Sequence, residues 1–189
     1  MRAKRSRVLW LAGLGGLAGL LAGCGSGSLV VNVDVYSFLK GTGQDTVVYA
    51  IPPNTSNTVA SSTPQKVSTP GAGSSLVDSV LIFGTLNLQN QSGTGTLGLQ
   101  LFIAADSAGT YNPSAAGLTV APKTVSGAVS VLDTVSGSLL KNVDSLFAKS
   151  QLWFRVAAQG SNASLVTPVV GKMVLKSLIL SVWMRQKLL

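Results

Sequence analysis

The chain has 189 residues, with 14 lysines and arginines, six aspartates, no glutamate, no histidine and one cysteine. Without histidine, neither a Ser-His-Asp or Cys-His catalytic arrangement nor an ordinary His/Cys zinc site can be built, and a single cysteine cannot form an intrachain disulfide. An apolar content of 46% with only 11% charged residues argues against a disordered chain.

The first residues have the layout of an export signal. Basic residues come first, at Arg2, Lys4, Arg5 and Arg7, and an uncharged apolar core follows over residues 8–21. This core is shorter than the roughly 20 residues that a membrane-spanning helix needs. A basic start followed by a short apolar core is typical of a secretory signal peptide.

The apolar core ends in Leu21-Ala22-Gly23-Cys24, which resembles the lipobox of bacterial lipoproteins residue for residue. The resemblance implies that residues 1–23 are removed by cleavage between Gly23 and Cys24. It also implies that the Cys24 thiol carries a diacylglycerol, and that the new amino terminus receives a fatty acid such as palmitate. Gly25 stands where an aspartate would favour the inner membrane, so the resemblance favours the outer membrane of the envelope. The alternative is a plain secretory signal with an incidental cysteine.

The predicted mature chain consists of a Gly/Ser tether at residues 24–28 and one domain over residues 29–189. Without residues 1–23 the chain keeps ten basic residues against six aspartates, a net charge of +4. These basic residues are scattered, with no run interleaved with aromatic residues, so we expect no nucleic-acid partner. The short tether predicts that the domain works close to the membrane surface.

Short apolar runs separated by Ser/Thr/Gly/Asn clusters predict an all-β domain. In chain order, alternation predicts strands at residues 29–39 and 46–51. Residues 52–75 are rich in Pro, Asn, Ser and Thr, and the only large aliphatic side chains among them are Val59 and Val67. Such a segment buries little apolar surface, so the sequence predicts a long flexible loop here.

The second half of the chain continues this pattern. Residues 77–89 and 96–104 predict a hairpin with its turn at residues 90–93, and residues 123–132 predict a further strand. Apolar spacing over residues 138–149 predicts one short helix capped by Ser138. Strands follow at residues 151–158 and 172–187, the last burying Val174, Leu178, Leu180, Val182 and Met184. About seven to eight strands and one short helix predict an antiparallel β-sandwich or jelly roll.

Oxygen-bearing side chains gather in one loop, at Asp106, Ser107, Thr110 and Asn112. Calcium binds six to eight oxygen atoms, often in such loops, so this is the candidate metal site. The alternative is that the side chains cap turns. The stretch Gly93-Thr94-Gly95-Thr96-Leu97-Gly98 fits the phosphate-binding pattern G-x-G-x-x-G, but that motif needs a helix after it, and here a strand follows.

Three outward-facing aromatic residues, Phe83, Phe102 and Trp153, lie opposite the aliphatic rows of their strands. They form either a second layer of core or an apolar surface for a ligand or partner. Three Asn-x-Ser triplets, starting at Asn54, Asn90 and Asn162, match the glycosylation sequon and are expected by chance in an Asn/Ser-rich chain.

The leading functional hypothesis is a non-catalytic, lipid-anchored envelope protein with a structural or partner-binding role, its partner an envelope protein or polymer. It rests on the lipobox and on the missing catalytic residue types, and it requires no cofactor. A carrier of a small apolar or lipid ligand is the second hypothesis, which a cavity between the sheets would support. A hydrolase using paired aspartates, such as Asp133 and Asp144, or a Ser–Lys pair is the third.

Overall fold

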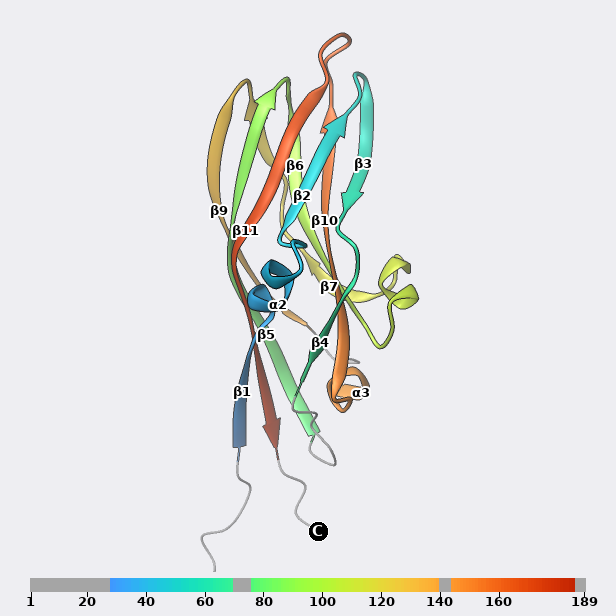
Figure 1. The fold of residues 1–189 in the computed structure, drawn as a ribbon, viewed down its shortest axis with the longest axis vertical. Coiled ribbons are helices and arrows are strands. Elements are labelled where there is room, and N and C mark those ends of the chain that lie inside the picture. Colours follow the sequence, from blue (N-terminus) through green and yellow to red (C-terminus); the bar gives the residue numbers. More distant parts are fainter. Residues whose placement is uncertain (1–27, 70–75, 140–143, 186–189) are drawn as a thin grey trace, which may run out of the picture.

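The computed structural model describes residues 28–69, 76–139 and 144–185. Most of these residues form two antiparallel sheets packed face to face (Figure 1). Sheet A contains β1 (Ser28–Asp34), β2 (Thr46–Ile51), β5 (Leu76–Ser92), β9 (Val129–Leu139) and β11 (Val169–Arg185). Sheet B contains β3 (Thr55–Ser61), β4 (Gln65–Ser68), β6 (Thr94–Ala104), β7 (Ala116–Thr119), β8 (Lys123–Ser126) and β10 (Gln151–Asn162). The predicted all-β sandwich is confirmed.

The structure describes eleven strands rather than seven or eight because three rows of the sheets are divided. Strands β1 and β2 both pair with β11, β3 and β4 both pair with β10, and β7 and β8 both pair with β6. The eleven strands therefore occupy eight rows, four in each sheet. The number of rows agrees with the prediction, whereas the breaks within the rows were not predicted.

Buried aliphatic and aromatic side chains from both sheets fill the interior. Tyr49 and Phe154 are the largest of them, and Ile82, Ile103 and Leu180 are fully buried. Strand residues that are two apart point to the same face, so the alternating patterns of β6, β10 and β11 supply about half of this core. Among the helices of the described residues, none combines the length and hydrophobicity that crossing a bilayer requires.

The strand predicted at residues 29–39 is wrong beyond Asp34, where helix α2 (Val35–Gly41) begins. The Asp34 carboxylate caps this helix by accepting a hydrogen bond from the Ser37 backbone N–H at 3.2 Å. Val35 and Leu39 are fully buried. Residues four apart share a face in both a strand and a helix, so alternation alone could not distinguish the two.

The hairpin predicted for residues 77–104 is also wrong. Both strands are present, but β5 pairs with β9 and β11 in sheet A, whereas β6 pairs with β7, β8 and β10 in sheet B. The chain therefore crosses from one sheet to the other at Gly93, which has a φ of +77°. Turn residues mark a reversal of the chain, but they do not say which sheet receives the next strand.

The long flexible loop predicted at residues 52–75 is wrong for most of its length. Strands β3 and β4 lie within it, both paired with β10, and residues 70–75 lie outside the described part. At the break between them, the buried Ser62 donates its backbone N–H to the Val156 carbonyl at 2.8 Å, and its Oγ accepts from the Val156 N–H at 3.1 Å. The ordering comes mainly from backbone pairing along β10, and Val67 of β4 adds one fully buried side chain to the core.

The strand predicted at residues 123–132 is two strands, β8 in sheet B and β9 in sheet A, joined by a turn at Gly127 with a φ of +62°. Strand β9 continues through Ser138, so Ser138 does not cap a helix. The predicted helix is reduced to α3 (Asp144–Phe147), while residues 140–143 lie outside the described part. Two α-helices and a 3-10 turn, η1 (Ala108–Tyr111), are described where one helix was predicted.

Strand β11 contains a bulge that the alternating pattern did not reveal. Its pairing with β5 shifts between Leu175 and Ser177, which reverses the face of every residue before the shift. Residues from Leu178 onward bury the predicted even-numbered side chains, whereas before the bulge Met173 and Leu175 are buried and Val174 is only partly buried. The predicted burial of Val174 is therefore wrong.

Candidate functional site

The predicted lipid-attachment residue Cys24 and the cleavage residue Gly23 lie outside the described residues. The described part begins at Ser28, which pairs with Arg185, so the start of β1 and the end of β11 lie together at the lower end of Figure 1. We call this end the base. Only Gly25, Ser26 and Gly27 separate Cys24 from Ser28, so Ser28 lies at most about 14 Å from the cysteine in an extended chain.

Four chain connections meet at the opposite end, which we call the upper pole: residues 52–54, 93, 127–128 and 163–168 (Figure 1). Backbone hydrogen bonds join them. The Gly127 N–H donates to the Gly93 carbonyl at 2.9 Å, and the Asn54 N–H donates to the Ser164 carbonyl at 2.7 Å. The connections therefore form one continuous surface, as far as possible from the base.

Two buried asparagines organise this pole from beneath. The amide nitrogen of Asn90 donates to the carbonyls of Ser92, Gly93 and Gly127 at 2.7–3.1 Å. Asn162 lies 2% exposed at the end of β10. Buried asparagine side chains with such partners fix the path of loops that have few apolar contacts of their own.

The side chain of Asn162 connects three segments of the pole. Its amide nitrogen donates to the Ile51 carbonyl at 3.2 Å and to the Thr167 carbonyl at 2.9 Å. Its oxygen accepts from the Ser164 backbone N–H at 2.9 Å. One side chain thus joins the end of β2, the end of β10 and the loop before β11. These two asparagines were proposed only as chance sequons, and their amide nitrogens are committed to the fold.

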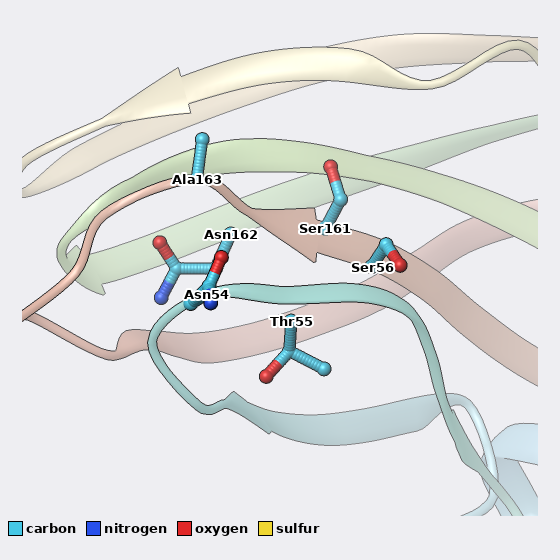
Figure 2. A pocket seen from close by; sticks show the side chains of 6 residues that line it. All are labelled: Asn54, Thr55, Ser56, Ser161, Asn162 and Ala163. Carbon is cyan, nitrogen blue, oxygen red and sulfur yellow. The ribbon is translucent and has the colours of Figure 1, made fainter.

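A pocket of about 310 Å3 opens between the start of β3 and the end of β10. Figure 2 shows its lining side chains, which are Asn54, Thr55, Ser56, Ser161, Asn162 and Ala163. Five of these six residues carry a hydroxyl or an amide group, and the lining carries no formal charge. Such a surface can donate and accept hydrogen bonds to neutral polar groups, but it supplies neither a titratable base nor an activated nucleophile.

The loop between β10 and β11 projects farthest at the upper pole (Figure 1) and carries an apolar pair at its tip. Leu165 and Val166 are 79% and 82% exposed. The loop has a defined shape, because the Ser164 Oγ accepts from the backbone N–H groups of Val166 and Thr167 at 3.2 and 3.0 Å. An aliphatic pair within a Ser/Asn/Thr/Pro turn was the sequence signal for this feature, and it was missed.

The candidate metal loop uses its oxygen atoms locally. The Asp106 carboxylate accepts from the Gly109 N–H at 2.7 Å, Thr110 Oγ1 donates to the Ser107 carbonyl at 2.7 Å, and Asn112 Oδ1 accepts from the Ser114 N–H at 2.9 Å. These are the bonds of turn and helix caps. The described residues contain no group of three or more potential His, Cys, Asp or Glu ligands. The loop geometry favours the turn-capping alternative.

A cation already lies beside this loop. Arg155, on the outer face of sheet B, is 6% exposed and donates from Nε and Nη2 to the Thr110 carbonyl at 3.1 and 2.7 Å. Its guanidinium lies between the Phe102 and Tyr111 rings, with centroids at 4.1 and 4.6 Å. Burial lowers the pKa of Arg155 from its usual value. A second cation in the loop would be repelled by this one.

The three outward aromatic residues have different outcomes. Phe102 and Trp153 in sheet B are partly buried, and Arg155 and η1 cover Phe102, so this sheet has a second packed layer. Phe83 in sheet A is 49% exposed. The interpretation as a second layer of core is therefore confirmed for sheet B, whereas Phe83 in sheet A lies exposed on the surface.

Three carboxylates of the described residues are engaged separately. Asp34 caps α2, Asp78 pairs with Arg185 at 2.6 Å, and Asp133 pairs with Lys123 at 3.2 Å. These contacts give the paired-aspartate hydrolase hypothesis no support. The side chain of Asp144, the other aspartate considered, lies outside what the structure describes. The apolar-carrier hypothesis gains no support from the pocket either, because the pocket lies at the end of the sandwich instead of between the sheets.

The glycines of the G-x-G-x-x-G stretch serve packing. A Cβ on Gly93 would collide with the Pro168 carbonyl oxygen, and one on Gly98 would lie 2.9 Å from that of Val120. No helix follows them, since β6 begins at Thr94. The stretch therefore lacks the helix N-terminus that binds phosphate in this motif.

No family model and no curated protein sequence matches this chain. Among solved structures, it is similar to a chain in the structure of the Gx strain of infectious bursal disease virus, with 8% sequence identity and a TM-score of 0.38. The match covers 84% of this chain and 41% of that chain, so this chain spans less than half the length of the viral one.

Proposed function

We propose that the chain is a lipid-anchored, non-catalytic protein of the bacterial cell envelope, with the outer membrane favoured, that binds an envelope protein or polymer close to the membrane surface. The observation that carries the proposal is the leader ending in Leu21-Ala22-Gly23-Cys24. Two or three acyl chains on one cysteine hold a protein on a bilayer far more firmly than a single chain does.

The arrangement of the domain supports a partner-binding role. Its anchored end would be the base, since β1 begins four residues after Cys24. The features suited to recognition lie at the upper pole, namely the neutral polar pocket and the exposed pair Leu165 and Val166. Exposed apolar side chains held in a fixed loop, next to hydrogen-bonding groups, are the composition of a protein interface with a polar rim. Such a pole binds through shape and hydrogen bonds, without any catalytic group.

The test of the anchor replaces Cys24 by Ser in the full chain expressed in a bacterium. We expect an uncleaved precursor that no longer incorporates labelled fatty acid, because this is the only thiol in the sequence. Ser26→Ala, two residues away in the tether, is the matched control and should be labelled and cleaved normally. Continued labelling of the Cys24→Ser protein would show that the lipobox interpretation is wrong.

A further inference from the structure

Sheet A carries an exposed apolar surface on its outer face, near the base. Val30, Phe83, Ile179 and Trp183 are each 40–49% exposed, and Leu81 beside them is partly exposed. Their pairing places them together: Val30 lies opposite Trp183, Ile179 opposite Phe83, and Ser181 opposite Leu81. Directly paired strand residues share a face with Cβ atoms about 5 Å apart. We call these five residues the base patch.

The upper half of the same face is different. Lys172 pairs there with Gln89, Gln89 pairs with Ser130, and Asn87 pairs with Leu132. Its exposed apolar residues, Val48 and Leu132, have polar pairing partners, Lys172 and Asn87 respectively. The outer face of sheet A is thus divided along its length, with the apolar half at the end from which the tether leaves. In the base half, Val30 with Trp183 and Phe83 with Ile179 are directly paired apolar residues, although Ser181 and Ser79 lie among them. An exposed apolar cluster of this kind marks a contact site.

We propose that the base patch lies against the lipid bilayer, so that the domain rests on its sheet A side instead of standing free on its tether. The proposal rests on the proposed lipid anchor. Because Ser28 is at most about 14 Å from Cys24, the start of β1 cannot leave the head-group region. Trp183 and Ile179 are four strand residues apart, about 13 Å, so the whole patch is within reach of the surface.

The side chains around the patch fit a lipid surface. Lys176, three residues before Ile179 in β11, is an exposed cation that anionic head groups attract. Of the nearby acids, Asp78 pairs with Arg185, whereas Asp34, opposite Ile179, caps α2 and keeps its negative charge at the edge of the patch. Tryptophan is enriched at membrane interfaces because its ring is apolar and its N–H is polar. Trp183 and Phe83 would enter the head-group boundary while the serines of β9 remain hydrated.

The chain contains its own pair of probes. After removal of Trp10 with the leader, only Trp153 and Trp183 remain, one on the outer face of each sheet. Trp153→Phe leaves Trp183 alone, and Trp183→Phe leaves Trp153 alone. Each acylated variant is reconstituted into vesicles of phosphatidylcholine and phosphatidylglycerol, in which a fraction of the lipid carries bromine high on its acyl chains. Bromine quenches tryptophan fluorescence on contact.

We expect Trp183 to lose most of its emission in brominated vesicles and to be shielded from aqueous iodide, whereas Trp153 keeps its emission. Phe83→Ser with Ile179→Ser should restore much of the Trp183 emission, while Val48→Ser with Leu132→Ser, in the upper half of the face, should not. If bromine does not quench Trp183 and iodide does, the base patch is a free surface in contact with water. If neither bromine nor iodide quenches Trp183, a second copy of the chain or another protein covers the base patch. Either result overturns the proposal.

The same samples separate this inference from the proposed function. Incorporated fatty acid reports on the anchor, and bromine quenching reports on the patch. Absence of acyl label overturns the anchor, and the bilayer contact that rests on it falls too. Label on Cys24 with no quenching of Trp183 overturns the bilayer contact alone.

Discussion

Single buried polar side chains determine the shape of the upper pole. The Tyr49 hydroxyl donates to Asn90 Oδ1 at 3.3 Å, while the Asn90 amide group holds the turns at Gly93 and Gly127. Tyr49 is 2% exposed, and its burial raises the pKa of the hydroxyl to about 12. The phenol must therefore stay neutral for the sandwich to keep its packing at this end.

This shift predicts how stability depends on pH at Tyr49. An unfolded tyrosine loses its proton near pH 10 and the folded Tyr49 near pH 12. The contribution of the neutral Tyr49 to the free energy of unfolding is therefore fully present below pH 10 and is lost as the pH rises to 12. A pKa that is two units higher in the folded state corresponds to about 2–3 kcal/mol of unfolding free energy. Chemical denaturation between pH 9 and pH 12 measures it. Tyr49→Phe removes the titrating group, and an equal loss of stability in that variant would contradict the prediction.

Three of the four edge rows of this sandwich are interrupted by short insertions, so that each consists of two strands instead of one continuous strand. Helix α2 interrupts the row formed by β1 and β2, beside the stretch of β11 that contains the bulge. At the end of this interruption, the Leu175 backbone N–H donates to the Asp45 carbonyl at 2.8 Å. The helix fills the break with two fully buried side chains, Val35 and Leu39. It is therefore part of the core rather than a surface decoration.

This role of α2 predicts that Leu39→Ala destabilises the domain by about 2–5 kcal/mol, since it leaves a cavity in the core. The adjacent Phe38 is 41% exposed, so Phe38→Ala should change stability by less than about 1 kcal/mol although it removes more atoms. Urea denaturation of both variants measures the difference. Equal effects at the two positions would mean that α2 does not pack as described.

The whole molecule is long and has different chemistry at its two ends. Strand β11 has 17 residues, so at about 3.3 Å per residue it spans roughly 55 Å from the upper pole to the base. With an anchor at the base, contact between the base patch and the lipid would keep the upper pole near the membrane as well. The domain would then meet partners embedded in, or lying on, the same membrane.

Lengthening the tether tests this arrangement. Inserting about 20 Gly/Ser residues between Ser26 and Gly27 increases the flexible reach severalfold. A photo-crosslinker at Leu165, at the exposed tip of the upper pole, should then lose its crosslinks to membrane neighbours, because five patch side chains alone hold the domain weakly. A crosslinker at Val59, which is 50% exposed on β3 of sheet B and therefore faces away from the membrane, is the control for random encounters. Unchanged crosslinks from Leu165 would show that closeness to the membrane is irrelevant.

The sequence by itself determined the fold class, the second strand at residues 46–51 and the burial of the even-numbered residues of β11 after its bulge. These depend on alternation and on turn residues, which are local properties. The sequence also carries the lipobox, a local motif that stays a prediction.

Tertiary structure decided the rest, because it depends on partners that are distant in the chain. Residues 55–61 form a strand because their backbone pairs with β10. The bulge in β11 places Val174 on the outer face of sheet A. The upper pole is assembled from four connections that no spacing rule relates. Its pocket and its exposed tip exist only where Asn162, through hydrogen bonds to Ile51 and Thr167, holds those connections together.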